Sequence, residues 1–379
     1  MEKYNLIVFG YNPWSDFWKR NQTMVYYLSE ETWIGEVFFV NPSIWFEQSL
    51  RAPLQEFSSL RKAYWRACFP HKVRSNIKVY TPVYIPKCAK WTELYINHLL
   101  ATYTNTPYIL LINGVMPRGV DLDKLTSNSV LSIYDWSDDF AQFAGDEDDK
   151  ERVQKKINHF IKSVDIVFTV NEKLLKRALK INTNSYPICN GTNLAMFHVR
   201  MQPKQKNSRP VIGYAGWLVP DRLDVELIHM CAKTLPEYDF VFVGPKVEKD
   251  PLRLCSAPTN IYYKKPVPFE ELPNVINSFD ICILPNNVNS YTDGNDPIKF
   301  YDYLYLGKPI VTTRTAGADK FLDIVDICDN YEDFCEAIVR RISCDDSNLV
   351  WIRQQYGIEN SWANRIKEVI KIITKNLAL

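Results

Sequence analysis

The stretch 279–313, FDICILPNNVNSYTDGNDPIKFYDYLYLGKPIVTT, constrains the fold most, because it predicts a strand, a loop, a helix and another strand in immediate succession. The apolar run 281–284 indicates a buried strand, and a polar loop rich in asparagine follows it. Residues 298–304 indicate a helix, and the run 310–313 indicates the next buried strand. Strands that alternate with helices predict an α/β protein with a mostly parallel sheet.

The predicted helix carries charged residues in a place that suits a ligand. Pro297 fits the first helical turn, Gly307 predicts the end of the helix, and Lys308 favours the negative end of its dipole. The loop and helix N-terminus at the carboxyl end of a strand are where an open α/β sheet binds anions. Lys299 and Asp302 lie one helical turn apart, so they offer a cation for phosphate and a carboxylate for vicinal hydroxyls. The same spacing equally describes an ordinary ion pair on the helix surface.

Composition narrows the class of protein. With 379 residues the chain is too long for one ordinary core, so two domains are expected. A hydrophobic content of 46% and a charged content of 23% indicate a globular protein, and the net charge of +1 gives no general preference for nucleic acid. Nine cysteines without a CxxC pair favour reduced thiols over a disulfide framework or a zinc site. No signal peptide or apolar run of about 18 residues is visible, which predicts a cytoplasmic protein.

Two predicted strands that end in glycine indicate two similar α/β domains. Residues 5–10 predict a buried strand that ends at Gly10, and residues 211–216 predict a second such strand that ends at Gly216. A glycine in this position lets backbone N–H groups approach a ligand closely. The polar, basic stretch 199–210 between the two series predicts the linker between the domains.

Carboxylates gather at the end of another predicted strand, 130–135. Asp135, Asp138 and Asp139 fall at or just beyond its carboxyl end. Crowded carboxylates raise one another's pKa, so one of them is a candidate general base toward an acceptor hydroxyl. Asp138 or Asp139 could instead cap the following helix. The spacing of these three aspartates is also similar to a DxD motif, in which aspartates bind a metal ion.

The stretch 51–90 is strongly basic, with nine lysines and arginines against one acidic residue, Glu56. Aromatic residues are interleaved with these cations, and residues 60–66 could form a basic amphipathic helix that lies on an anionic membrane. Nucleic-acid binding is the competing function, but no recognised nucleic-acid module accompanies it. A solvated basic face is the non-functional alternative.

Three motifs together resemble those of the GT-B glycosyltransferases. They are the segment 296–313, DPIKFYDYLYLGKPIVTT, the turn 187–193, PICNGTN, and the pair Ser361 and Trp362 that opens the last predicted helix. The resemblance is to enzymes of bacterial surface-polysaccharide assembly, either family-4-like or similar to xanthan-type glucuronosyltransferases. It implies an α/β protein with the GT-B fold, in which two Rossmann-like domains face a central cleft.

The resemblance also implies domain boundaries. An N-terminal acceptor-binding domain would span residues 1–203, and a C-terminal nucleotide-sugar-binding domain would span residues 204–360. A helix at 361–379 would cross back to the N-terminal domain, as is typical of the family.

The same resemblance assigns roles to residues. Asp138, Asp139 or Asp135 would supply the catalytic base. GT-B enzymes generally need no metal, so we expect neither a metal site nor a further cofactor here. The expected donor-binding residues lie in the loops and the helix N-terminus that the family uses for the nucleotide sugar: Gly10, Gly216, Arg222, Lys246, Val267, Asp296, Ile298, Lys299 and Asp302. Arg222 takes the diphosphate role because Trp217 stands where the family usually has an arginine.

The motifs do not decide whether the sugar is transferred with retention or with inversion of its anomeric configuration. Retaining relatives usually carry two glutamates eight positions apart, and here Gly294 and Asp302 occupy those positions. Asp293 or Asp296 could substitute for the first glutamate. An inverting reaction would instead use one of the carboxylates that follow the strand 130–135.

The expected function is transfer of a hexosyl group from a nucleotide diphosphate sugar to a polysaccharide or lipid-linked saccharide acceptor. A nucleotide-sugar 2-epimerase and a catalytically inactive GT-B-fold binding protein are the alternatives. The expected partners are the donor, the acceptor and an anionic membrane at the inner face of the plasma membrane, contacted through residues 51–90. No nucleic acid is expected as a partner.

Overall fold

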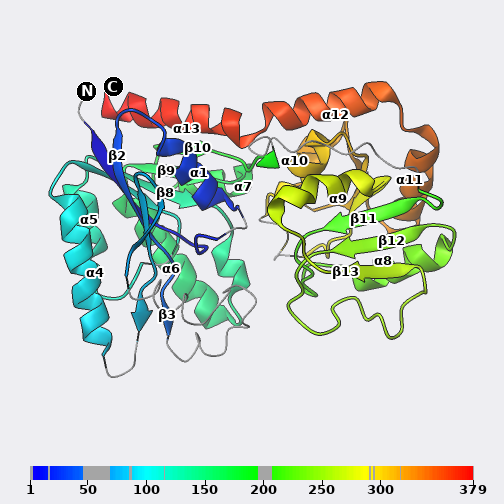
Figure 1. Cartoon of the computed structure of the whole chain (residues 1–379), viewed down its shortest axis with the longest axis horizontal. Coiled ribbons are helices and arrows are strands. Elements are labelled where there is room, and N and C mark those ends of the chain that lie inside the picture. The colour runs from blue at the N-terminus through cyan, green and yellow to red at the C-terminus, as the bar shows by residue number, and fades with distance from the viewer. Residues whose placement is uncertain are drawn as a thin grey trace. The chain divides into compact units, whose positions relative to one another are not determined.

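The computed structural model divides the chain into two compact units, which are described separately (Figure 1). Unit 1 comprises residues 1–137, 151–188 and 366–379, and unit 2 comprises residues 138–150 and 189–365. The structure describes residues 3–15, 18–45, 69–84, 88–114, 116–194, 207–289, 292, 295–315 and 317–378. Most of the predicted linker lies outside the described residues, so the expected domain boundaries stay predictions.

Unit 1 is built on a sheet whose strands follow the order β10-β9-β8-β7-β1-β2-β5-β4. The strands are β1 (Tyr4–Phe9), β2 (Ile34–Val40), β4 (His71–Arg74), β5 (Ile77–Tyr80), β7 (Tyr108–Ile112), β8 (Leu131–Trp136), β9 (Ile166–Thr169) and β10 (Ser185–Pro187). Neighbours pair in parallel, except that β4 runs antiparallel to β5. A separate short pair joins β3 (Ile44–Trp45) to β6 (Val83–Tyr84). Strands β7 and β8 are buried along their whole length, as expected for parallel strands with helices on both faces.

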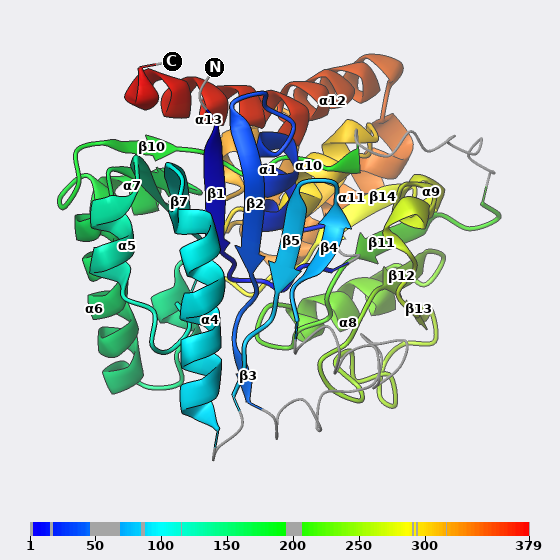
Figure 2. The same ribbon diagram turned by 60° about the vertical axis from the view of Figure 1, so that its left-hand side comes forward.

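Helices cover the two faces of this sheet. They are α1 (Arg20–Leu28), α4 (Ala89–Thr104), α5 (Leu122–Asn128) and α7 (Glu172–Ala178), together with α6 (Glu147–Ser163), which begins in the segment 138–150 and continues into unit 1. Figure 2 shows α4 in front of the sheet and α1 behind it. The order of the strands reverses between β1 and β7, so the loops after these two strands are neighbours.

The last helix, α13 (Trp362–Leu377), packs on unit 1 over most of its length. Its apolar residues Ile366, Val369 and Ile373 are buried and recur at helical spacing. Ile373 lines the same small apolar cavity as Leu6 of β1 and Met24 of α1. The burial of this apolar stripe explains why the C-terminal segment folds as a helix on this unit.

Unit 2 contains a parallel sheet with the order β13-β12-β11-β14-β15-β16. Its strands are β11 (Val211–Ala215), β12 (Asp239–Val243), β13 (Ile261–Lys264), β14 (Ile281–Leu284), β15 (Ile310–Thr313) and β16 (Asp326–Cys328). Its helices are α8 (Val225–Thr234), α9 (Leu272–Ser278), α10 (Ile298–Tyr305), α11 (Tyr331–Cys344) and α12 (Ser347–Glu359), with single 3₁₀ turns at Phe140–Phe143, Phe269–Glu271 and Asp319–Phe321. The α/β fold predicted from the alternation of strands and helices is confirmed.

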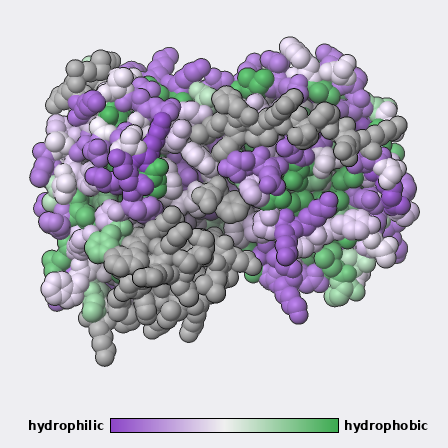
Figure 3. Space-filling model, in the orientation of Figure 1, coloured by the Kyte–Doolittle hydropathy of each residue, from purple (hydrophilic) through white to green (hydrophobic). Residues whose placement is uncertain are grey.

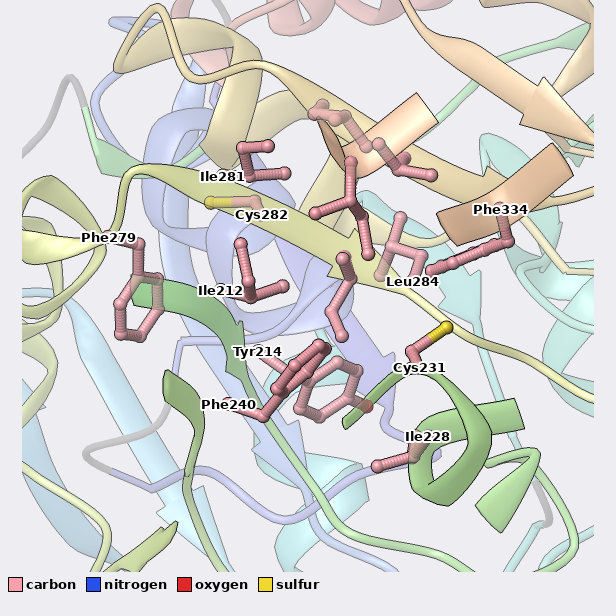
Figure 4. Close-up of a cluster of buried hydrophobic side chains, with 14 of the residues drawn as sticks. Ile212, Tyr214, Ile228, Cys231, Phe240, Phe279, Ile281, Cys282, Leu284 and Phe334 are labelled. Carbon is pink, nitrogen blue, oxygen red and sulfur yellow. The ribbon is translucent and has the colours of Figure 1, made fainter. Parts of the chain in front are cut away.

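The core of unit 2 lies between its sheet and the helices that pack on it, α8, α9, α10 and α11. Figure 4 shows Ile212 and Tyr214 of β11, Phe240 of β12 and Leu284 of β14 among these side chains. All four are at most 1% exposed. At roughly 25 cal/mol per Å² of apolar area, burial of such side chains is the main force that holds the sheet together.

The predicted strand–loop–helix–strand unit is present as β14, α10 and β15. Lys308 behaves differently from the expectation, because its ammonium donates to the carbonyl oxygens of Asn277 and Phe279, at 2.6 and 2.8 Å. These carbonyls lie at the end of α9, so the lysine caps that helix and not α10. Gly357 lets α12 approach α10 closely, since a Cβ there would lie 2.3 Å from the nitrogen of Tyr305.

The visible surface of the described residues mixes hydrophilic and hydrophobic side chains, with only small hydrophobic areas (Figure 3). Among the described residues, every helix falls short of the length and apolar character needed to cross a membrane.

Candidate active site

The strand order of unit 2 reverses between β11 and β14, and the loops after both strands meet there. The N–H of Asn287, after β14, donates to the carbonyl oxygen of Arg222, after β11, with an N···O distance of 2.8 Å. Leu223 and Asn286 form a β-bridge next to this bond. Open α/β sheets bind ligands at such a reversal, outside the carboxyl ends of the strands. Arg222 is thus held at the edge of the sheet where an anion would bind.

Lys299 and Gly216 lie against each other at the same edge. A Cβ built on Gly216 would lie 2.2 Å from Cε and 2.7 Å from Nζ of Lys299, and the φ of Gly216 is +147°. The Lys299 ammonium is also 5.1 Å from the centroid of the Tyr214 ring, within range of a cation–π interaction. Two residues predicted to bind the donor therefore come together, and the glycine leaves the space that the lysine side chain fills.

The loop after β12 supports the Gly216 loop. A Cβ on Gly244, whose φ is +146°, would lie 2.1 Å from the carbonyl oxygen of Gly216. Lys246 forms a β-bridge with Leu218 and so belongs to the same group of loops. Its ammonium donates to the carbonyl oxygen of Lys249 at 2.7 Å. The predicted cation Lys246 thus lies near the Gly216 loop but is directed toward its own turn.

Val267 and Ile298 occupy two further predicted positions. Val267 follows β13 at the edge of the sheet, and its half-buried side chain packs against the hydrophobic core of unit 2. Ile298 is the first residue of α10 and is half-buried. The N–H groups of a first helical turn have no partners within the helix, so they are available to an anion.

Asp302 is buried on α10, with 7% of its surface exposed. The hydroxyl of Thr192 donates to its Oδ1 at 2.7 Å. Burial raises the pKa of the Asp302 carboxyl to about 7, and the Thr192 hydrogen bond and the charge of Lys299 act in the opposite direction. The hydrogen bond joins the turn at 190–193 to the helix that carries Lys299.

Asp296 lies in a second buried network just before α10. One of its carboxylate oxygens accepts the N–H of Asn190 at 2.7 Å. Both oxygens accept the hydroxyl of Tyr301 at 3.0 Å, and the ammonium of Lys320 pairs with Oδ1. The Asp296 side chain is fully buried. These contacts fix the start of α10, and the donor contact expected of Asp296 stays a prediction.

Asp138 combines partial exposure with an altered acidity. Burial raises the pKa of its carboxyl to about 7, and the guanidinium of Arg222 is the main charge that lowers it. The negative charges of Asp139 and Asp296 raise this pKa further. A carboxyl group with a pKa near neutrality suits a general base, because it is both available and basic at physiological pH.

Asp139 has only 3% of its surface exposed and directly precedes the 3₁₀ turn Phe140–Phe143. Its side chain makes no capping hydrogen bond to that turn. The N–H of Asp139 donates to Oδ1 of Asp138 at 3.1 Å. The backbone N–H of Asp139 thus holds the Asp138 carboxylate, and helix capping by the Asp139 side chain is not observed.

Asp135, in unit 1, is bound by a buried arginine. The Nε of Arg20 donates to both carboxylate oxygens at 3.1 and 3.0 Å, and Nη2 lies 2.7 Å from Oδ1. The amide of Asn113 donates to Oδ2 at 2.7 Å. Asp135 and Arg20 are 1% and 5% exposed. With its oxygens engaged by cationic and amide donors, this carboxylate is a structural ion pair and a poor general base.

Gly10, also in unit 1, lies at the reversal between β1 and β7. A Cβ on Gly10 would lie 2.4 Å from the ring of Phe39 and 3.0 Å from the amide nitrogen of Asn21. The absence of a side chain is therefore explained by packing within unit 1, independently of any ligand.

The structure adds residues that sequence reasoning missed. Thr192, Asn190 and Lys320 hold the two aspartates of the α10 region, and Asn113 holds Asp135. No local pattern indicates these partners, because each is far away in sequence. The alternative acidic residue Asp293 and the neighbouring Gly294 lie outside the described residues.

The chemistry of the site follows from its charges. Two cations, Lys299 and Arg222, lie at the edge of the unit 2 sheet with the N-terminus of α10, and this combination suits a diphosphate. Within the described ranges, no group of three or more histidine, cysteine or acidic side chains is arranged to hold a metal ion.

Comparisons with known proteins found similarity in sequence and in fold. Residues 209–343 match the family model of the glycosyl transferases group 1. A Bacillus subtilis (strain 168) protein named as a teichuronic acid biosynthesis glycosyltransferase, TuaH, is 26% identical over 159 residues. That alignment covers 40% of this chain and 38% of the relative, so the match spans well under half of either protein.

Solved structures resemble the chain over nearly its whole length. Sucrose-phosphate synthase from Thermosynechococcus elongatus has a TM-score of 0.72 at 11% identity, covering 99% of this chain and 100% of that one. An E. coli trehalose-6-phosphate structure bound with UDP-2-fluoro glucose has a TM-score of 0.66 at 10% identity, covering 99% of each chain. Anabaena HepE in complex with UDP has a TM-score of 0.62 at 9% identity, covering 98% of this chain and 100% of that one. Residues 209–343 are therefore similar to the glycosyl transferases group 1, and the chain as a whole has the GT-B fold that these solved structures share.

Proposed function

We propose that the protein transfers a hexosyl group from a nucleotide diphosphate sugar to a polysaccharide or lipid-linked saccharide acceptor. The contact of Lys299 with Gly216 at the strand reversal of unit 2 is the observation that carries the proposal. Similarity to group 1 glycosyl transferases and to proteins solved with UDP or UDP-2-fluoro glucose supports a nucleotide sugar as the donor. The name of the Bacillus relative supports a surface polysaccharide as the acceptor class.

In the proposed reaction, Lys299 and Arg222 neutralise the diphosphate as the bond to the sugar breaks. The N-terminus of α10 adds its partial positive charge, which stabilises the developing negative charge on the leaving group. Thr192 holds Oδ1 of Asp302, and the ribose hydroxyls of the donor would bind Oδ2. Gly216 keeps the ammonium of Lys299 in place because no side chain competes for the space.

We assign the general base to Asp138, whose Oδ1 accepts the backbone N–H of Asp139. The carboxylate of Asp138 would accept the proton of the acceptor hydroxyl as that oxygen attacks the sugar. Its pKa of about 7 suits this step, whereas Asp135 is engaged by Arg20. A base of this kind corresponds to an inverting reaction.

We further propose that the acceptor is met at the inner face of an anionic membrane. In the described part of the basic stretch, Phe69 and Val73 are 52% and 38% exposed, and Lys72 between them is also exposed. Residues 51–68 of this stretch lie outside the described residues. Sedimentation with vesicles of anionic and of neutral lipid tests the contact, and equal binding to both would contradict it.

Calorimetric titration with a panel of nucleoside diphosphates and nucleotide sugars tests the donor site. We expect one nucleoside diphosphate to bind the wild-type chain, and Lys299→Ala to weaken its binding at least tenfold, because a phosphate loses a charge-assisted contact. Lys233→Ala removes an exposed lysine from α8 of the same unit and is the matched control. Unchanged affinity in Lys299→Ala would show that the site is wrongly assigned.

The product of the reaction distinguishes the alternatives. Release of a nucleoside diphosphate that depends on a saccharide acceptor identifies a transferase. Conversion of the donor sugar without loss of the nucleotide would identify an epimerase, and binding without either reaction would identify an inactive binding protein.

A further inference from the structure

Two cysteine thiols meet in the core of unit 2, away from the proposed donor site. Cys231 lies on α8 and Cys335 on α11, and their sulfur atoms are 3.0 Å apart. Both side chains are buried, with 1% and 6% of the residue exposed. Figure 4 shows Cys231 near Phe334, the residue that precedes Cys335, with Cys282 of β14 on the opposite side of the cluster. The pair therefore bridges two helices that are 104 residues apart in sequence.

The two thiols influence each other's acidity. The hydrogen bond between the two thiols is the main cause that lowers the pKa of Cys335, and it favours a thiolate at that residue. The same hydrogen bond and burial raise the pKa of Cys231. A thiolate next to a thiol is the arrangement from which a disulfide forms, because the thiolate reacts with the oxidant and the neighbouring thiol resolves the product.

A third thiol, Cys328 of β16, is part of the same surroundings. Burial raises the pKa of the Cys328 thiol to about 12. Cys328 therefore stays protonated and is the slower nucleophile. Cys335 also has the sulfur of Met230 at 4.0 Å, which completes a sulfur-rich seam between α8 and α11.

We propose that Cys231 and Cys335 are an oxidation site, at which hydrogen peroxide converts the two thiols into a reversible disulfide. The Cys335 thiolate attacks the peroxide oxygen, so that the O–O bond breaks and, with one proton, water and a sulfenic acid are formed. The Cys231 thiol then attacks the Cys335 sulfur, an S–S bond forms, and the hydroxyl leaves with the Cys231 proton as a second water. A small-molecule thiol reverses the oxidation by thiol–disulfide exchange.

The disulfide would join α8 to α11 close to the loop that carries Arg222. Tyr331 lies one turn before Cys335 on α11, and its hydroxyl donates to Oδ2 of Asp224 at 2.7 Å. Asp224 caps α8 through the N–H of Leu227 and is two residues after Arg222. A disulfide would lock α8 to α11 below this contact and restrict the unfolded chain, so the oxidised protein should be the more stable form.

Peptide mapping of the full chain after treatment with hydrogen peroxide tests the proposal. The background variant has the exposed Cys88, Cys255 and Cys344 replaced by serine, which removes competing reactions at these three thiols. We expect the peptides containing Cys231 and Cys335 to be joined, and the Tm of the oxidised chain to rise by roughly 5 °C, with reversal by dithiothreitol. Cys335→Ser in this background should abolish both effects, while Cys189→Ser should leave them unchanged.

A second experiment forms the disulfide during refolding, so that the result does not depend on how fast peroxide reaches the buried thiols. The unfolded chain is refolded in a buffer of reduced and oxidised glutathione, in which the native arrangement selects the pair. Joined Cys231 and Cys335 peptides after refolding support the proposal. The proposal is overturned if both thiols remain free to alkylation in both treatments, or if Cys231 pairs with Cys328 instead.

Discussion

The side chain of Lys299 occupies the space that a Cβ on Gly216 would need, with Cε only 2.2 Å from that position. The glycine and the lysine are 83 residues apart in sequence, and each was expected in the donor site on separate grounds. Their contact means that the position of the ammonium depends on the absence of a side chain after β11.

The first prediction follows from this contact. Gly216→Ala would displace Lys299 and would also strain the backbone, because φ at this position is +147°. We expect nucleoside diphosphate affinity to fall by roughly 10- to 100-fold, corresponding to about 1.4–2.8 kcal/mol, as measured by calorimetry. Gly145→Ala is the control, since a Cβ there meets nothing within 4 Å. Equal affinities in the two variants would contradict the dependence of Lys299 on Gly216.

The second prediction concerns the Arg20–Asp135 ion pair. Arg20→Ala leaves a buried carboxylate without its cation and should lower the free energy of unfolding by about 3–5 kcal/mol, measured by denaturant titration. Lys155→Ala is the control, because Lys155 pairs with Glu151 where both side chains are exposed, at 73% and 66%. That variant should lose only a small part of the free energy of unfolding. A similar small loss for Arg20→Ala would mean that the buried pair stabilises little.

The third prediction concerns the pH dependence of transfer. If Asp138 is the base, kcat/KM should fall about tenfold per pH unit as the pH drops below about 7, where the carboxylate becomes protonated. Asp138→Asn should remove this acid limb of the pH profile and lower kcat/KM by roughly 10²- to 10⁴-fold. Asp139→Asn should keep the limb. A limb that survives in Asp138→Asn would assign the base to another residue.

The fourth prediction uses the hydrogen bond from Thr192 to Asp302. The pKa of Asp302 is raised to about 7, so the folded chain keeps a proton that the unfolded chain loses near pH 4. The contribution of this group to stability is therefore complete at low pH and is lost as the pH rises toward 7.

Thr192→Val removes the donor that stabilises the charged form. We expect a loss of about 1.5–3 kcal/mol at pH 8 and a smaller loss at pH 5, measured by urea titration at both values. In an Asp302→Asn background the difference between the two pH values should disappear. A loss of the same size at both pH values would show that the hydroxyl does not act on the carboxylate's charge.

The sequence predicted the α10 region well because its signals are local. Apolar runs identify β14 and β15, and Pro297 and Gly307 lie where the helix begins and ends, within one or two residues. Lys308 shows the limit of such signals. A cation near a helix end was expected to favour α10, but its ammonium binds carbonyl oxygens at the end of α9, 29 to 31 residues earlier.

The carboxylates after β8 could not be told apart from the sequence. Asp135 and Asp138 are three residues apart, yet one is bound by Arg20, 115 residues away, and the other is influenced by Arg222. Whether a carboxylate is a structural ion pair or a titrating group depends on such partners. The pattern of residues located the group of acids, and only the folded chain separates their chemistry.

The division of the chain between the two units limits how the protein can be dissected. The backbone passes from one unit to the other after residues 137, 150, 188 and 365, so neither unit is a continuous fragment. A chain that stops at residue 365 would lack most of α13 and would expose Leu6 and Met24 to water where Ile373 now covers them. Studies of either unit alone therefore require circular permutation or co-expression of separate pieces, and simple truncation would yield an aggregation-prone product.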